Sequence, residues 1–322
     1  MKIAFFDSGI GGLSVLAEAL RRFSGAEFLY FADEDHVPYG TKSRAQIVRL
    51  SLDAVGFLVS RGADAVVVAC NTATSAAISE LRGAFSIPVI GMEPAVKLAA
   101  DSFGTRPTLL IATPLTIAGE KLARLVGRLE CETWSLPLPH LVEFAQDLEF
   151  DSPAVRAYLR EELAKFELER LGSLVLGCTH FNYFKDVLRE ILPSHVRIID
   201  GIDGTLNRLA SELGGGLKLA CGEDFSELAC KFDAEELDAG GGQNARGKSR
   251  QCEGSDESAR SEQGKKGGDE QGAEEYDGNS GKIYYPNGNS VEYFYSGRAL
   301  DAARLGRIEL FLARLEKMRE ID

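Results

Sequence analysis

The chain lacks any stretch that approaches about 18 uninterrupted apolar residues, so the sequence predicts no membrane-spanning helix. The apolar run at the N-terminus, Ile3 to Phe6, is too short for a signal peptide and predicts a first strand instead. We therefore expect a cytoplasmic protein without a membrane partner.

Cysteine pairs at metal-ligand spacing are missing as well. The six cysteines form no Cys-x-x-Cys pair, which favours free thiols over a disulfide framework or a zinc site, and we expect no bound metal. An excess of basic residues is also absent, since the formal net charge is −13. This charge argues against nucleic acid as a partner and means that local backbone donors and hydroxyls would have to hold any carboxylate ligand.

A complete nucleotide fingerprint is the third absence. The glycine turn at residues 9–12 follows the first predicted strand, and Asp33 ends the next one, which is close to a dinucleotide-binding pattern. The third glycine of that pattern is lacking, Asp7 would repel a pyrophosphate, and no Gly-Lys-Ser or Gly-Lys-Thr follows the turn. A nucleotide cofactor is therefore disfavoured.

Two apolar runs that end in cysteine organise what is present. One reads Ala-Val-Val-Val-Ala-Cys-Asn-Thr over residues 65–72, and the other reads Leu-Val-Leu-Gly-Cys-Thr-His over residues 174–180. Apolar runs without polar alternation predict parallel strands that are covered on both faces. Cys70 and Cys178 would then lie at strand exits, where α/β sheets bind their ligands.

The order of predicted strands and helices indicates an α/β fold with two similar flavodoxin-like domains, mainly parallel sheets and a cleft between them. Asp7 precedes Cys70 by nearly the same distance as Thr113 precedes Cys178, which suggests an architectural repeat. We expect a first domain of residues 1–95 plus about 207–322, and a second of residues 96–206.

Two features of the C-terminal half complete the expected organisation. Residues 239–282 contain no Leu, Ile, Val or Phe, and this composition predicts a disordered insertion. Residues 282–285 and 290–295 predict a hairpin, and residues 181–192 and about 300–318 predict helices. Apolar helix faces permit a homodimer.

Two thiols at equivalent exits suggest a specific chemistry. A single buried cysteine usually fills the core, but two at matching positions, each followed by small polar residues, favour function. A carbon that loses a proton on one face and regains it on the other needs a base and an acid that exchange roles. Thiol and thiolate are both accessible near neutral pH, so Cys70 and Cys178 could supply them.

Four strings in this order resemble the glutamate racemases of the aspartate/glutamate racemase superfamily: Phe6-Asp7-Ser8-Gly9-Ile10-Gly11-Gly12, Pro38-Tyr39-Gly40, Ala69-Cys70-Asn71-Thr72-Ala73 and Gly177-Cys178-Thr179-His180-Phe181. The resemblance covers residues 1–213 well and the final helix loosely. It implies interconversion of L- and D-glutamate without a cofactor, which supplies D-glutamate for peptidoglycan.

The resemblance also implies roles for individual residues. Cys70 would take the α-proton from D-glutamate and Cys178 from L-glutamate, with Asp7 and His180 as their respective helpers. The positions that would hold the substrate are Asp7, Ser8, Tyr39, Gly40, Asn71, Thr72, Thr113, Thr116, Glu143, Thr179 and His180.

Some residues depart from the family pattern and leave alternatives open. Asn182 stands where a proline is usual, and His140 replaces a proline before Leu141-Val142-Glu143. These departures leave room for aspartate as the substrate. A superfamily enzyme with one working cysteine, such as a decarboxylase, isomerase or hydrolase, and a non-catalytic receptor for a small acidic ligand are the other hypotheses.

Overall fold

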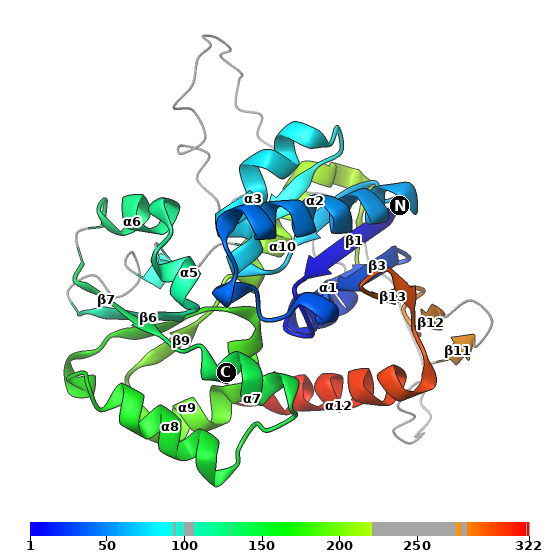
Figure 1. Cartoon of the computed structure of the whole chain (residues 1–322). Helices are drawn as coiled ribbons and strands as arrows, with labels where there is room; N and C mark the ends of the chain where they lie inside the picture. The colour runs from blue at the N-terminus through cyan, green and yellow to red at the C-terminus, as the bar shows by residue number, and fades with distance from the viewer. Residues whose placement is uncertain are drawn as a thin grey trace, which may run out of the picture.

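The structure is a computed structural model that describes residues 1–92, 95, 96, 98, 99, 106–129, 131–220, 275–277, 282–319 and 321. It contains two separate sheets, each built mainly from parallel strands and flanked by helices (Figure 1). The predicted α/β class is confirmed. Within the part of the chain that the structure describes, no helix combines the length and apolar composition needed to cross a bilayer.

The larger sheet has the strand order β11-β12-β13-β3-β1-β4-β5, and β14 pairs with β13. Strands β13, β3, β1, β4 and β5 run parallel, whereas β11, β12 and β14 are antiparallel additions at one edge. The strands are β1 (Lys2–Asp7), β3 (Glu27–Ala32), β4 (Ala65–Val68), β5 (Val89–Gly91), β11 (Glu275–Asp277), β12 (Lys282–Tyr284), β13 (Ser290–Tyr295) and β14 (Arg298–Ala299).

The smaller sheet has the order β7-β6-β8-β9, and all its strands are parallel. Numbered within each sheet, both orders contain the flavodoxin-like sequence 2-1-3-4, with β1 and β6 in equivalent places. The strands are β6 (Thr108–Ala112), β7 (Thr133–Pro137), β8 (Ser173–Gly177) and β9 (Arg197–Ile199), and a separate ribbon pairs β2 (Phe23–Ser24) with β10 (Lys218–Leu219).

Helices cover both faces of the sheets because strand side chains alternate between two cores. Ile3 and Phe5 of β1 join a core that extends into the smaller sheet, while Ala4 and Phe6 pack with α2 and α3. The helices are α1 (Leu13–Arg22), α2 (Arg44–Ser60), α3 (Asn71–Ala84), α5 (Pro114–Ile117), α6 (Glu120–Val126), α7 (His140–Gln146), α8 (Pro153–Leu163), α9 (Lys185–Ile191), α10 (Ile202–Leu213) and α12 (Ala302–Arg319).

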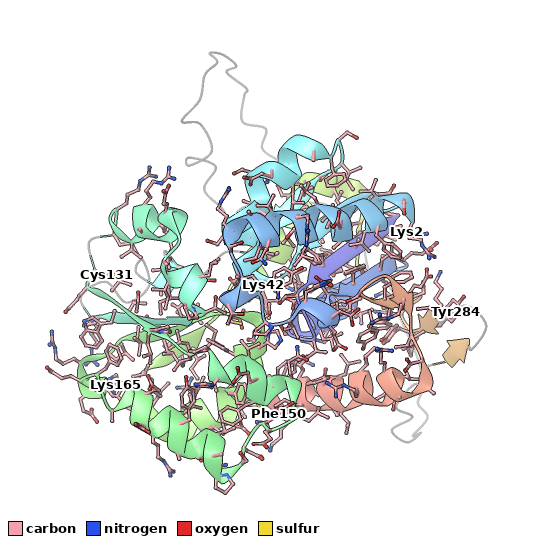
Figure 2. The ribbon with its side chains drawn as sticks, viewed as in Figure 1. Lys2, Lys42, Cys131, Phe150, Lys165 and Tyr284 are labelled. Atoms are coloured by element: carbon pink, nitrogen blue, oxygen red, sulfur yellow. The ribbon has the colours of Figure 1, made fainter. Side chains whose placement is uncertain are left out.

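The last helix, α12, runs from the side of β13 toward the helices of the smaller sheet (Figure 1). Phe311 of α12 packs against Phe150 and Tyr183, and Phe150 lies near the C-terminal end of α12 in Figure 2. Arg314 donates from Nε to the Tyr183 carbonyl and pairs with Asp186. The C-terminal helix therefore packs against the segment that follows β8 and stabilises it.

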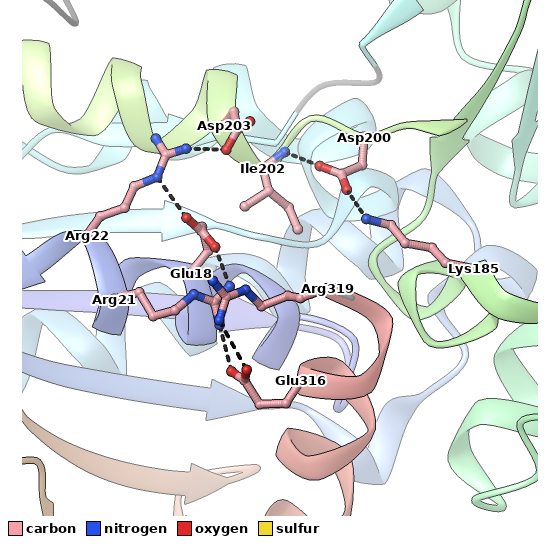
Figure 3. A network of polar contacts seen from close by, with 9 residues as sticks. All are labelled: Glu18, Arg21, Arg22, Lys185, Asp200, Ile202, Asp203, Glu316 and Arg319. Atoms are coloured by element: carbon pink, nitrogen blue, oxygen red, sulfur yellow. Dashed lines mark hydrogen bonds and ion pairs between the residues drawn. The ribbon is translucent and has the colours of Figure 1, made fainter. Parts of the chain in front are cut away.

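An ionic network also joins elements from both halves of the chain (Figure 3). Arg22 of α1 pairs with Glu18 and with Asp203 of α10, and Arg21 pairs with Glu316 of α12. Lys185 of α9 pairs with Asp200 nearby. These contacts hold α1, α10 and α12 together on the side of the molecule behind the strand exits.

Two expectations need correction. The predicted hairpin is present as β12 and β13, but residues 181–192 are not one α-helix, since the 3₁₀ segment η4 (Thr179–Phe184) precedes α9. All six residues of η4 are buried, which a helix with one apolar face could not achieve. Most of the predicted insertion lies outside the described residues; the prediction of disorder is wrong for Glu275–Asp277 and Lys282, which lie in strands. The domain boundaries stay a prediction.

Candidate active site

A cavity lies between the carboxyl ends of β1 and β4 and those of β6 and β8. Its volume is about 30 Å³. Its walls are Ser8, Pro38, Tyr39, Gly40, Thr41, Cys70, Thr72, Thr113, Pro114, Pro139, Val142, Glu143, Cys178, Thr179 and His180. Both predicted cysteines therefore line one cavity, and they come from different sheets.

Cys70 is the N-cap residue of α3 and is 4% exposed. The backbone N–H of Ala73 donates to its Sγ at 3.4 Å, and its thiol donates to Oγ of Ser8 at 3.5 Å. Burial, together with the nearby carboxyl of Asp7, raises the pKa of Cys70 to about 11. The thiol is therefore protonated at neutral pH, while the Ala73 and Ser8 contacts are placed to stabilise its thiolate.

Cys178 follows β8 and is the N-cap residue of η4. Its Sγ lies 3.9 Å from Nδ1 of His180. Burial raises the pKa of Cys178 well above its ordinary value, and the nearby Cys70 sulfur adds to the rise. Like Cys70, Cys178 is therefore protonated at neutral pH in the free site, and a thiolate on one sulfur would oppose ionisation of the other.

Asp7 ends β1 and is completely buried. Its Oδ1 accepts from the N–H of Gly9 at 2.9 Å, and its Oδ2 accepts from the Thr179 hydroxyl at 3.1 Å. Burial raises the pKa of Asp7 to about 7, although these hydrogen bonds oppose the shift. The carboxyl group can therefore gain or lose a proton near neutral pH.

The glycine turn after β1 has a steric role. A Cβ built on Gly11 would lie 2.4 Å from Nδ1 of His180 and 2.5 Å from Oγ1 of Thr179, and one on Gly9 would lie 2.3 Å from Nε2 of Gln146. The absent side chains allow residues of the other half to approach the turn closely. This explains the glycines without a nucleotide.

Hydroxyl groups form a cluster at one side of the cavity. Oγ1 of Thr72 lies 2.9 Å from Oγ1 of Thr113 and 3.3 Å from Oγ1 of Thr116. The Tyr39 hydroxyl donates to Oδ2 of Asp33 at 2.7 Å, and burial raises the pKa of Tyr39. Among the described residues, no lysine or arginine lines the cavity, so donors to a carboxylate there are hydroxyls and backbone N–H groups.

Not every predicted residue reaches the cavity wall. Asp7, Asn71 and Thr116 lie behind it, and Oδ1 of Asn71 is buried with no partner among the described residues. Glu143 lies at the wall with its side chain 58% exposed, and it pairs with His140 at 2.8 Å. The other predicted positions are all brought together.

Two neighbours of the site escaped the sequence motifs. Gln146 ends α7, and its Nε2 lies 3.0 Å from Nε2 of His180. Asp33 contacts Tyr39, His36 and Ser296. Asp33 directly follows β3, one position beyond Ala32, which pairs in register with Asp7 of β1; its place at a strand end is the signal that the sequence offered. Within the described ranges, no group of three or more His, Cys, Asp or Glu residues could hold a metal ion.

Known proteins resemble the chain over most of its length. The family model described as Asp/Glu/Hydantoin racemase matches residues 9–209. A glutamate racemase of Campylobacter curvus is 55% identical over 248 residues, which cover 74% of this chain and 93% of that protein.

Solved structures agree with this similarity. Glutamate racemase from Campylobacter jejuni is 25% identical with a TM-score of 0.61, over 72% of this chain and 96% of that one. The Escherichia coli glutamate racemase, in complex with L-glutamate and the activator UDP-MurNAc-Ala, is 32% identical with a TM-score of 0.60, over 67% and 85% of the two chains. The expected resemblance and the two-domain fold are confirmed.

Proposed function

The chain belongs to the Asp/Glu/hydantoin racemase family, and from that premise we propose that it interconverts L- and D-glutamate by proton transfer between Cys70 and Cys178. The observation that carries this proposal is the shared cavity: thiols from two different sheets line one small space. Racemisation needs an acid and a base on opposite sides of one carbon, and two such thiols supply them.

The proton inventory of the proposed reaction balances with one negative charge on the sulfur pair. For D-glutamate, Cys70 first gives its thiol proton to the Asp7 carboxylate as the substrate binds; the resulting Cys70 thiolate takes the α-proton, the Cα–H bond breaks and an S–H bond forms. The Cys178 thiol then gives its proton to the opposite face of Cα and becomes the thiolate. L-glutamate follows the reverse path, so no proton, electron or cofactor is consumed. The contribution of the Cys70 sulfur to the raised pKa of Cys178 supports a single negative charge, since it disfavours a second thiolate.

Asp7 and His180 support the two sulfurs from different sides. The carboxyl of Asp7, whose pKa burial raises to about 7, acts on the Cys70 side and can relay a proton when substrate enters or leaves. His180 acts on the Cys178 side, where Nδ1 lies 3.9 Å from Sγ. Both are helper residues in this proposal, and the reacting atoms are the sulfurs.

The substrate carboxylates would be bound by neutral donors. Ser8, Thr72, Thr113 and Thr179 line the cavity and carry hydroxyls, and α3 offers the N–H groups of its first turn. D-glutamate made here would serve peptidoglycan synthesis, and the absence of any cofactor is part of the proposal.

The test is a chirality assay of the purified protein with L-glutamate, D-glutamate and L-aspartate supplied separately. We expect D-glutamate from L-glutamate and the reverse, with little product from aspartate. Cys70→Ala and Cys178→Ala should each lower kcat by at least about 1,000-fold while circular dichroism stays unchanged. Cys131→Ala, at a half-buried thiol away from the cavity wall, is the matched control.

Two outcomes would replace the proposal. Loss of activity in only one cysteine variant would indicate an enzyme with a single working thiol. Calorimetric glutamate binding without turnover, retained in both variants, would indicate a receptor. Turnover of aspartate in place of glutamate would change the assigned substrate, but the proposed proton transfer between the two thiols would stand.

A further inference from the structure

Gln146 touches His180 on the side of the ring that faces away from Cys178. Its amide Nε2 lies 3.0 Å from Nε2 of His180, and Nδ1 of the same ring lies 3.9 Å from Sγ of Cys178. The histidine is 2% exposed. One buried imidazole thus bridges an amide and a thiol, with a different ring nitrogen for each.

This arrangement fixes which nitrogen carries the proton. Burial lowers the pKa of His180 to about 3, so the ring is neutral over the physiological range and has a single N–H. An amide NH₂ can only donate, so the Nε2 that receives its hydrogen bond must be the unprotonated nitrogen. The ring proton is then on Nδ1, which is the nitrogen beside sulfur.

Gln146 is held both at its backbone and at its side chain. The backbone carbonyl of Gln146 accepts from Nη2 of Arg307 at 2.9 Å, which ties the end of α7 to α12. Its side-chain Nε2 also lies only 2.3 Å from the position that a Cβ on Gly9 would take, so the turn after β1 packs directly against the side-chain amide. Gln146 is thereby packed between the glycine turn and the imidazole.

We propose that Gln146 is a positioning residue that selects the Nδ1–H tautomer of His180, so that the imidazole donates a hydrogen bond to the Cys178 thiolate and does not accept its proton. The inference rests on the proposed two-thiol function and deepens it. When Cys178 takes the α-proton of L-glutamate, the Cα–H bond breaks and the S–H bond forms, and the Nδ1 proton stays on the ring. On the Cys70 side, the N–H of Ala73 has the equivalent role.

The most direct test reads the tautomer without any turnover. Long-range ¹H–¹⁵N correlation spectra of the imidazoles report whether each ring nitrogen carries a proton. The chain has four histidines, so a His180→Asn spectrum identifies the signals of His180. We expect a protonated Nδ1 and an unprotonated Nε2 in the wild-type protein. An unprotonated Nδ1 would overturn the proposal.

Variants at Gln146 supply the kinetic test. Gln146→Glu keeps the shape but offers an acceptor to Nε2, so the NMR pattern should change to a protonated Nε2. Gln146→Met removes the donor at similar length. In a Cys70→Ala background, both should raise the apparent pKa for iodoacetamide alkylation of Cys178. In the otherwise wild-type enzyme, both should lower kcat by about 10- to 100-fold with KM nearly unchanged, the range expected for one hydrogen bond to a charged group.

Asp147→Asn, at the exposed next residue, is the matched control and should change none of these readouts. If the Gln146→Glu variant folds normally, an unchanged pKa for alkylation of Cys178 together with an unchanged kcat would refute the positioning role. If the proposed function itself fails, the result is different. The Cys178→Ala variant would then keep its racemase activity, and the tautomer of His180 could still be measured by NMR.

Discussion

The hydroxyl of Thr179 donates to Oδ2 of Asp7 at 3.1 Å, and this bond joins the segment after β8 to the end of β1. Both groups are buried, so a residue beside the second thiol directly contacts the carboxyl group near the first. This hydrogen bond links the two halves of the site, as does the one between Thr72 and Thr113. A substitution of Asp7 should therefore affect the site on both the Cys70 side and the Cys178 side.

Asp7→Asn should raise stability at alkaline pH. Burial raises the pKa of Asp7 from 3.8 to about 7. Between these values the unfolded chain releases a proton that the folded chain keeps, so the free energy of unfolding falls as the pH rises from about 4 to 7 and then stays low. The asparagine variant lacks this loss and should gain up to about 4 kcal/mol over the wild type at pH 8.

Urea unfolding at pH 4 and pH 8 measures this difference, which should be small at pH 4. The same variant should lose roughly 100-fold in kcat, because the neutral amide cannot relay a proton. Equal pH dependence in both proteins would contradict the assignment of the raised pKa to Asp7.

Gly11→Ala should impair the site by steric conflict. The new methyl group would lie within 2.5 Å of Thr179 and His180, so η4 would have to shift. We expect a loss of about 1–3 kcal/mol in stability and a large loss of kcat. Gly306→Ala in α12 is the control, because no heavy atom lies within 4 Å of its Cβ position, and it should keep full activity. Similar activity in both variants would argue against the close approach.

Thr72→Val should weaken substrate binding. The substitution keeps the shape but removes the hydroxyl that bonds to Thr113 at 2.9 Å and faces the cavity. If the hydroxyl cluster binds a substrate carboxylate, KM for glutamate should rise by about tenfold or more, which corresponds to one lost hydrogen bond. Steady-state kinetics check this, with Thr133→Val in β7 as the comparison. An unchanged KM would remove the cluster from the binding site.

Arg314→Met should destabilise the fold. The arginine is buried, donates to the Tyr183 carbonyl and pairs with Asp186, whose side chain is 13% exposed. Removing it leaves polar groups without their main partner, at a cost of about 2–4 kcal/mol. Arg124→Met, whose side chain is 72% exposed, should cost less than about 1 kcal/mol. The urea unfolding midpoints of the two variants measure this difference. Equal midpoints would contradict the stabilising role of the contacts between α12 and the segment after β8.

Sequence alone predicted the strands that lead to Cys70 and Cys178, the place of both cysteines at their exits and the α/β class, because each depends on a local run of residues. Val66 to Val68 in β4 and Leu174 to Leu176 in β8 have all-buried side chains, as their uninterrupted apolar runs indicated. These features needed no knowledge of distant contacts.

The missed features depend on packing between distant segments. Gln146 meets His180 only because α7 lies against η4, and no local pattern distinguishes it from Glu143, three residues earlier on the same helix. The segment η4 is also packed against α12, which lies more than a hundred residues later and covers Tyr183. Such contacts have no signature in a short motif.

The most direct test of the two-thiol account is racemisation of L-glutamate in heavy water, stopped at low conversion and analysed by mass spectrometry of each enantiomer. We predict that D-glutamate carries deuterium at Cα while the remaining L-glutamate keeps protium, because one thiol removes the proton and the other supplies a solvent-exchanged one. D-glutamate that retains the original protium would contradict the account.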